Sequence, residues 1–340
     1  MATLGNTFVD LIDIYKQTDP DGSAARIIEI LKQQNPVLED AIAMECNDGG
    51  KHEHTIRTGL PSVAWGKLYK GIPQSKSHTQ QVVDTTGFVN ALSTIDSRVL
   101  KKAKGNEAQI RLNEALAFIE SMNQEAATGI FYHSTDTTPE KIQGLSPRYS
   151  VRGGSGAGNN VIHGGGSGSD NTSIWFVTWG DRFTHLLYPE GSKAGLQRED
   201  KGEQRVTDAN DDAYYVMEEL FQWDLGVAVK DWRYNSRVAN IDVSEMQAGN
   251  VALYDLMRQA YYKLQSRMRR GDAATGRQAI YCNRDVLEAL DALATNAGAS
   301  DSFVRLKPME IQGEEVLTYR GIPIRETDAL VNNEELVPTA

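Results

Sequence analysis

The stretch Trp223-Asp224-Leu225-Gly226-Val227-Ala228-Val229-Lys230-Asp231-Trp232-Arg233-Tyr234 gives the clearest structural signal in this chain. From residue 221 to residue 229, large apolar side chains occupy every second position and polar or small ones lie between them. Because successive side chains of a strand point to opposite faces, this alternation predicts a strand with one buried face. The segment 232–241 is predicted to continue it. The apolar run 174–179 is predicted to form another, fully buried strand.

A long helix is predicted upstream, from Gly105 to Ala127. Its apolar side chains recur at spacings of three and four, which places them on one stripe: Leu112, Leu116, Ile119, Met122 and Ala126. Asn106 with Gln109 resembles a capping box at the start, and Gly129 suits a left-handed position after the end. At 1.5 Å per residue the helix is roughly 33 Å long, enough to support a sheet.

Other elements follow from the same patterns. Helical spacing predicts one helix over 244–268, and a short strand over 278–282 precedes a helix that Asn283 caps. Residues 311–316 read as a hairpin turned at Gly313, and 317–325 as a final strand. The glycine-rich run 152–168 predicts a long flexible surface loop.

The first forty residues are predicted to form two short amphipathic helices. Leu4, Phe8, Leu11, Ile12 and Tyr15 share one face, and Ile27, Ile28 and Leu31 share another. Asn35-Pro36 ends the second helix, because the residue before proline avoids the helical region. Two such helices cannot bury their own apolar faces, so they lie either on the body of the same chain or on a neighbouring copy. Both readings stay open on these residues.

The segment from Gly49 to Asp84 is basic and extended. Strand-like pieces such as Thr55-Ile56-Arg57 and Gln81-Val82-Val83 lie among many glycines and prolines. Five basic side chains against two acidic ones give this segment a net charge of +3, in a chain whose net charge is −11. Such a loop is suited to an acidic surface on a neighbouring copy, where complementary charge sets register and partner choice. A solvated β-hairpin is the alternative.

Composition excludes several classes of protein. The chain has 340 residues and two cysteines, and it shows neither a secretory signal nor a membrane-spanning apolar run. Its acidic balance disfavours a broad electrostatic grip on nucleic acid. We therefore predict a cytoplasmic environment with reduced thiols and no contact with a membrane.

No set of residues predicts catalysis, a cofactor or a metal site. His52-Glu53-His54 is the one close histidine pair, and its spacing places both imidazoles on one face of a strand, without a third ligand nearby in sequence. The glycine-rich run lacks the lysine and hydroxyl of a phosphate-binding loop. Arg267, Arg269 and Arg270 match the negative end of a helix dipole.

The order of these segments resembles the major capsid proteins of tailed double-stranded DNA bacteriophages, which have the Hong Kong 97-type fold, and in particular their short-tailed branch. The resemblance runs from about Val37 to Val337. Besides 223–234, it is carried by the following stretches: Trp65-Gly66-Lys67-Leu68-Tyr69-Lys70-Gly71-Ile72, Gly129-Ile130-Phe131-Tyr132-His133, Pro139-Glu140-Lys141-Ile142-Gln143-Gly144-Leu145, Tyr281-Cys282-Asn283-Arg284 and Gly321-Ile322-Pro323-Ile324-Arg325.

The resemblance implies an α+β fold and a division of the chain. Residues 1–48 would form an N-terminal arm, and residues 49–84 the extended E-loop. Residues 85–243 and 306–340 would form a peripheral domain with a long spine helix and a β-sheet, and 244–305 an axial domain. It also implies contacts between subunits, through Trp65, Lys67, Tyr69, Lys70 and Lys76 of the E-loop and through Phe8, Leu11, Ile27 and Leu31 of the arm.

The implied function is structural. Copies would assemble as pentamers and hexamers into the icosahedral head of a virion, built in the host cytoplasm around phage double-stranded DNA that they touch weakly and non-specifically. The arm is too short to hold the scaffolding segment of some relatives, so a separate scaffolding protein is implied, beside a portal protein and a possible decoration protein. No motif identifies a crosslinking partner for the loop lysines, so assembly is expected to be non-covalent. The alternatives are an encapsulin-like bacterial compartment shell and a soluble metal-dependent hydrolase that uses His52 and His54.

Overall fold

The computed structural model describes residues 32–102, 106–208, 210–265, 276–295, 306–311 and 314–340. The two helices predicted in the first 31 residues, and with them Phe8, Leu11, Ile27 and Leu31, lie outside the described residues. No described helix has the length and apolar character needed to cross a membrane.

The described chain contains thirteen strands: β1 Ala43–Glu45, β2 Lys51–Gly59, β3 His78–Asp96, β4 Val161–His163, β5 Asn171–Trp179, β6 Thr184–Tyr188, β7 Gln197–Thr207, β8 Ala213–Val229, β9 Ser236–Asp242, β10 Arg277–Cys282, β11 Lys307–Ile311, β12 Glu314–Tyr319 and β13 Ile322–Glu326. Its helices are α2 Val37–Asp40, α3 Ser97–Lys101, α4 Glu107–Tyr132, α5 Leu145–Arg148, α6 Val243–Gln247, α7 Leu253–Lys263 and α8 Arg284–Thr295, with 3-10 turns η1 Gly156–Asn160 and η2 Trp232–Tyr234.

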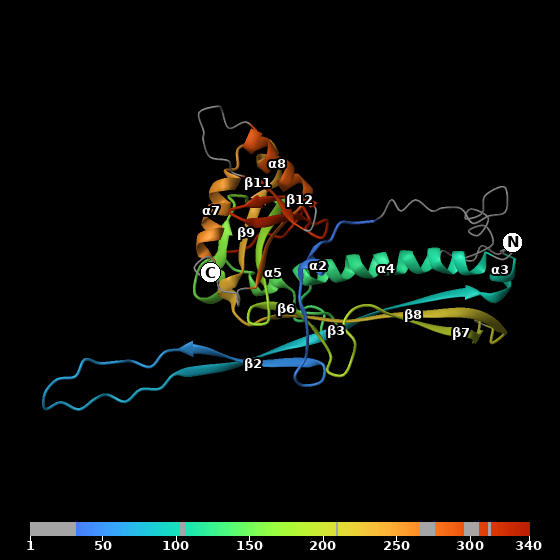
Figure 1. The fold of residues 1–340 in the computed structure, drawn as a ribbon, viewed down its shortest axis with the longest axis horizontal. Coiled ribbons are helices and arrows are strands. Elements are labelled where there is room, and N and C mark those ends of the chain that lie inside the picture. The colour runs from blue at the N-terminus through green and yellow to red at the C-terminus, as the bar shows by residue number, and fades with distance from the viewer. Residues whose placement is uncertain (1–31, 103–105, 209, 266–275, 296–305, 312–313) are drawn as a thin grey trace.

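All thirteen described strands are hydrogen-bonded into one mixed sheet, in the order β11-β12-β13-β10-β5-β6-β8-β3-β2 with β1, β4, β7 and β9 attached beside this path. Figure 1 shows two regions. In one, α4 runs along the long strands β3, β8 and β7; in the other, α7 and α8 cover β9 to β13. The β2–β3 hairpin projects from the body at the end opposite to α3.

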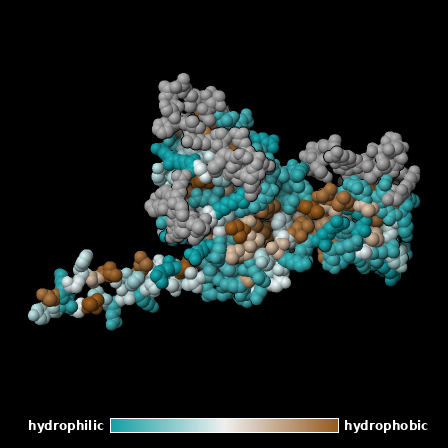
Figure 2. Space-filling model, in the orientation of Figure 1, coloured by the Kyte–Doolittle hydropathy of each residue, from teal (hydrophilic) through white to brown (hydrophobic). Residues whose placement is uncertain are grey.

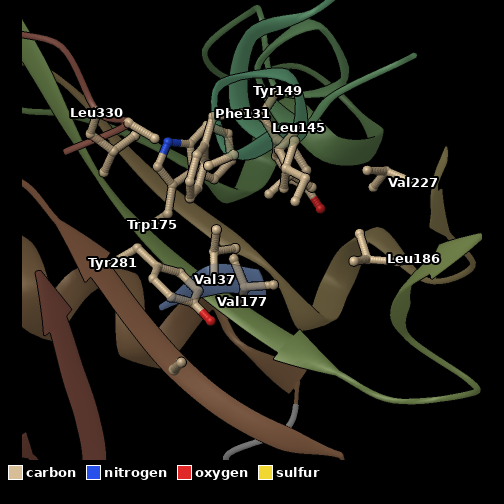
Figure 3. Packing of buried hydrophobic residues seen from close by; sticks show 14 of the residues in the cluster. Val37, Phe131, Leu145, Tyr149, Trp175, Val177, Leu186, Val227, Tyr281 and Leu330 are labelled. Atoms are coloured by element: carbon tan, nitrogen blue, oxygen red, sulfur yellow. The ribbon is translucent and has the colours of Figure 1, made fainter. Parts of the chain in front are cut away.

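Strand β5 explains how the second region is held together, because it is buried along its whole length. Trp175, Val177 and Trp179 point into one core, where Phe131 of α4 and Tyr149 pack around Trp175 (Figure 3). Ile174 and Phe176 point into the core beneath α7 and α8. A strand covered on both faces has apolar side chains at adjacent positions, which is the pattern that predicted it. The prediction over 174–179 is confirmed.

The strand predicted over 221–229 is confirmed and is part of the longer β8. Phe221, Leu225 and Val227 are buried, as the alternation required. The segment predicted over 232–241 is extended from Ser236 onward, as β9, but it does not continue β8. The 3-10 turn η2 redirects the chain, and β9 pairs with β5 and β4 instead of β8.

The long helix is confirmed as α4, but it continues to Tyr132 and its buried face differs from the predicted stripe. Met122 and Ala126 are buried, whereas Leu112 and Leu116 are exposed. Small side chains such as Ala115 let the helix lie close to Phe221 on the sheet, so they take the inner positions. Gly129 is not a terminator, because Ile130 and Phe131 continue the helix to fill the core.

Two further predictions are corrected by packing. The helix predicted over 244–268 is two helices, α6 and α7, and Gly249 between them has a left-handed φ of 78°. The glycine-rich run 152–168 is not a free loop, because η1 and β4 form within it and β4 pairs with β9. At Gly164 a side chain would meet the carbonyl oxygen of Asn240 at 2.7 Å, so this glycine permits close packing.

The C-terminal elements follow the predicted order with one change. The strand predicted over 317–325 is a hairpin of β12 and β13, turned at Arg320 and Gly321, which both have positive φ. Helices α7 and α8, within residues 244–305, share one core with β4, β5, β9 and β13, which lie outside that range. The domain boundaries drawn from the resemblance stay a prediction.

The predicted cap of α8 gives a first test of the fold. Asn283 accepts a hydrogen bond from the backbone N–H of Val286 at 3.0 Å, which satisfies one donor of the first turn. We expect Asn283→Ala to lower the free energy of unfolding by about 1 kcal/mol. Urea denaturation of the unassembled protein measures it. Both Asn283→Ala and Asn283→Ser lose the hydrogen bonds that Nδ2 donates to Thr172 and Asn332, but the serine keeps a capping oxygen and is expected to lose less. Equal losses in both variants would contradict the cap.

Candidate intersubunit contact surfaces

The E-loop, residues 49–84, is a hairpin whose base is paired and whose end is open. Strands β2 and β3 pair in antiparallel register from Lys51 opposite Thr85 to Gly59 opposite His78. Residues 60–77 beyond this ladder form no helix or strand. The bend is closed by a hydrogen bond from the N–H of Lys70 to the carbonyl of Lys67, with Tyr69 in a left-handed conformation. The strands predicted around 55–57 and 81–83 are confirmed.

The open end carries apolar side chains that contact almost nothing in this copy. Six of them are between 80% and 108% exposed: Leu60, Val63, Trp65, Leu68, Tyr69 and Ile72. Figure 2 shows hydrophobic residues spaced along the projecting hairpin. Concentrated apolar exposure of this kind marks a surface that another molecule covers. Trp65 and Tyr69, both predicted as contact residues, belong to this group.

The predicted basic residues lie on the same projection. Lys67, Lys70 and Lys76 are exposed, and no carboxylate of the described chain lies within ion-pair distance of their ammonium groups. The structure therefore brings all five predicted E-loop residues together on one projecting hairpin.

The predicted contact residues of the N-terminal arm lie outside the described residues. The described chain begins beside α4, where the N–H of Gln33 donates to Glu120.

A second exposed surface was missed from the sequence. Val89 and Ala91 of β3 pack toward α4, so Phe88 and Leu92 at the alternate positions lie on the opposite face of the sheet. They are 67% and 50% exposed. We call this the outer sheet face; it consists of Phe88, Leu92, Glu199, Glu218 and Asp224, as the pairing of β3, β8 and β7 places them. The alternating positions of β3, with Phe88 and Leu92 on one face, are the sequence signal from which this surface could have been predicted.

The base of the E-loop holds a buried group of ionisable side chains. His52 and His54 point from β2 toward the body, and the His52 ring lies 5.6 Å from that of His185 on β6 and 6.2 Å from that of His54. Asp84 of β3 lies opposite His52. It forms an ion pair with Arg148, in which Oδ1 of Asp84 lies 2.8 Å from Nη2 of Arg148. Nδ1 of His54 lies 3.9 Å from Asp84.

Burial sets the ionisation of these histidines. It lowers the pKa of His52 and of His54, and it lowers the pKa of His185 to about 4 with a further contribution from the positive charge of Lys230. The three rings are therefore neutral near pH 7. Sequence reasoning had paired His52 with His54 but could not find His185, which is 131 to 133 positions away. Among the described residues no group of three or more ligands is arranged to hold a metal ion.

One family model and several solved structures match this chain. The family model described as major capsid protein GP7 matches residues 19–338. A chain of the bacteriophage Epsilon15 structure is 31% identical, with a TM-score of 0.77 and all of both chains covered. The capsid of a native GTA particle is 10% identical over 66% of this chain and 95% of that one, with a TM-score of 0.44.

An encapsulin complex from Synechococcus elongatus is 11% identical over 69% of this chain and 96% of that one, with a TM-score of 0.43. No curated protein matches this chain.

Proposed function

The chain belongs to the family of major capsid protein GP7, and we propose that its E-loop joins neighbouring copies in the capsid shell. Family membership confirms the predicted Hong Kong 97-type fold and the structural, non-enzymatic role, and it assigns the protein to the capsid of a virion. Copies of such a protein associate with one another.

One observation carries the proposal: Trp65 is 98% exposed near the end of the E-loop, which projects from its own subunit. Burying a side chain of this type contributes roughly 1.5–3 kcal/mol by area alone, and five further apolar side chains stand beside it. The body of the same copy does not cover them. A second copy supplies the missing surface.

The outer sheet face is the surface that fits the E-loop best. It offers apolar contact through Phe88 and Leu92 and negative charge through Glu199, Glu218 and Asp224. Residues 197–229, which include β7 and β8, carry nine carboxylates against three basic side chains, a net charge of −6. The E-loop carries +3. Opposite charge around apolar anchors orients partners during association and excludes wrong registers.

We infer that these contacts repeat within pentamers and hexamers of an icosahedral head, since a contact between two different surfaces forms a ring when its rotation closes. The N-terminal arm, residues 1–48, would add contacts through Phe8, Leu11, Ile27 and Leu31. We also propose the division of the chain that the resemblance implies, into a peripheral domain (85–243 and 306–340) and an axial domain (244–305). Further proposed partners are a separate scaffolding protein, a portal protein, a decoration protein and weakly bound double-stranded DNA, with assembly in the host cytoplasm.

Zero-length crosslinking tests the proposed contact directly. Particles are assembled from equal amounts of unlabelled and ¹⁵N-labelled subunits and treated with a carbodiimide, which joins lysine to carboxylate. We expect mixed-isotope peptides that link Lys67 or Lys70 to Glu199, Glu218 or Asp224. Unassembled subunits serve as the control and should give none. Abundant links between subunits at other sites, with none from the E-loop lysines, would refute the contact.

A further inference from the structure

We propose that His52, His54 and His185 form a proton-operated latch that holds the base of the E-loop at neutral pH and releases it on acidification. The latch acts on the orientation of the hairpin within a single subunit. Its consequence for the shell rests on the proposed function, because the E-loop reaches a neighbour only while its base is fixed.

The latch lies at the base of the hairpin, on a strand at the edge of the sheet. Strand β2 is at the end of the sheet and pairs with β3 alone among the described strands. At its inner end, the carbonyl of Gly50 accepts hydrogen bonds from the N–H and the hydroxyl of Thr86. From there to Gly59 the strand is held by the ladder, by two hydrogen bonds between the backbone of Glu53 and the side chain of Asn47, and by the side chains of His52 and His54 beneath it. A change in the packing of these two rings therefore changes the attachment of the whole projection.

The rings occupy a buried site that favours their neutral forms. His185 is fully buried, and His52 and Asp84 are 8% and 3% exposed. Nδ1 of His52 and both ring nitrogens of His54 and of His185 make no hydrogen bond. A neutral imidazole tolerates such a position at moderate cost, whereas an imidazolium has two donors and a charge that must be satisfied.

Most of the charged groups that face the rings are paired with one another. Asp84 on β3 faces Arg148 of α5, which also donates to the carbonyl of Val227. Lys230, after β8, is paired with Asp181 of the β5–β6 connection at 3.3 Å. Lys51 and Glu53, at the alternate positions of β2, lie on the opposite face of the strand and pair with each other at 3.0 Å. Protonation adds up to three positive charges to a site that already holds Arg148 and Lys230. Oδ2 of Asp84 has no hydrogen-bond partner and lies 3.9 Å from Nδ1 of His54, so it can balance one added charge, whereas the carboxylate of Asp181 is paired with Lys230.

The direction of the pH dependence follows from burial. The closed base lowers the histidine pKa values below the ordinary 6.5, so the open form binds protons first. The closed form is therefore fully favoured above pH 6.5 and loses stability as the pH falls. For His185 alone, a pKa of about 4 when covered and the ordinary 6.5 when open change the ratio of closed to open forms by about 20-fold between pH 7 and pH 5.

Hydrogen–deuterium exchange of the unassembled full-length protein tests the latch. Peptides covering residues 49–59 are compared at pH 7.5 and pH 5.0, in buffer with EDTA and after correction for the intrinsic exchange rate. We expect protection of these amides to fall by about tenfold or more at pH 5.0, while peptides from α4 keep theirs. Unchanged protection of residues 49–59 would overturn the proposal.

Variants separate the latch from general acid sensitivity. The triple variant His52→Gln, His54→Gln, His185→Gln is expected to lose the pH response, whereas His78→Gln, on the exposed part of β3, keeps it. A full response in the triple variant would reject the latch. If the triple variant does not fold, His54→Gln alone should reduce the response, and an unreduced response would count equally against the proposal. The exchange measurement uses unassembled subunits, so its outcome does not depend on whether shells form. A protein that forms no shells would refute the proposed function and leave the test of the latch intact.

Discussion

The double variant Lys67→Glu/Lys70→Glu is expected to fold normally and to lose assembly. The two reversals change the net charge of the E-loop from +3 to −1, so the loop is repelled by the acidic outer sheet face that it is proposed to cover. At about 1 kcal/mol for each exposed charge contact, every loop contact loses about 2 kcal/mol. That raises the subunit concentration needed for assembly by about 30-fold. Gradient sedimentation separates particles from free subunits and measures the loss.

Two controls make this result specific. Lys67→Arg/Lys70→Arg keeps both charges on the same exposed positions and should assemble like the unmodified protein. The charge-reversed variant should recover part of its assembly at high salt, because exposed charges are screened there. Heads of normal yield from Lys67→Glu/Lys70→Glu at low salt would show that the lysines do not contribute to the contact.

A buried ion pair attaches the C-terminal segment to the sheet, and its loss is expected to lower the stability of the fold strongly. Arg237 of β9 donates to Oε2 of Glu334 at 2.9 Å, and both side chains are almost fully buried. Tyr132 at the end of α4 and Ser173 of β5 also donate to this carboxylate. Glu334→Ala would leave the Arg237 charge buried without its partner. We expect the free energy of unfolding to fall by about 3–5 kcal/mol.

Urea denaturation of unassembled subunits measures this loss, with Glu335→Ala as the matched control. Glu335 is the next residue and is exposed, so its removal should change stability by less than about 0.5 kcal/mol. Glu334→Gln keeps two hydrogen-bonding atoms but not the charge, and it should fall between the two. Equal stability of Glu334→Ala and Glu335→Ala would mean that Arg237 finds another way to be satisfied.

Elements with a strong local period were predictable. The alternation over 221–229 located β8, and the apolar run 174–179 located β5. In the same way, Asn283 before an apolar repeat located the start of α8. In each case the information lies within one segment, because the face that a strand or a helix buries repeats at a fixed spacing.

Predictions failed where a neighbour distant in sequence decides the outcome. Leu112 and Leu116 fit the apolar stripe of α4, yet Ala115 takes the position against Phe221 because a small residue allows a closer approach. Gly129 has the sequence signature of a helix end, but the core needs Phe131 in helical continuation. The run 152–168 looks flexible, while its glycines accommodate the backbone near Asn240.

The amino-acid order alone determined the succession of strands and helices, the basic extended E-loop and the resemblance to phage capsid proteins, since these depend on spacing and composition along the chain. Tertiary structure decided which apolar residues stay uncovered, such as Trp65 and Phe88, and which ionisable ones meet, such as His52 with His185. Burial and proximity are properties of the folded chain, because they are set by strands far apart in sequence that the sheet brings side by side.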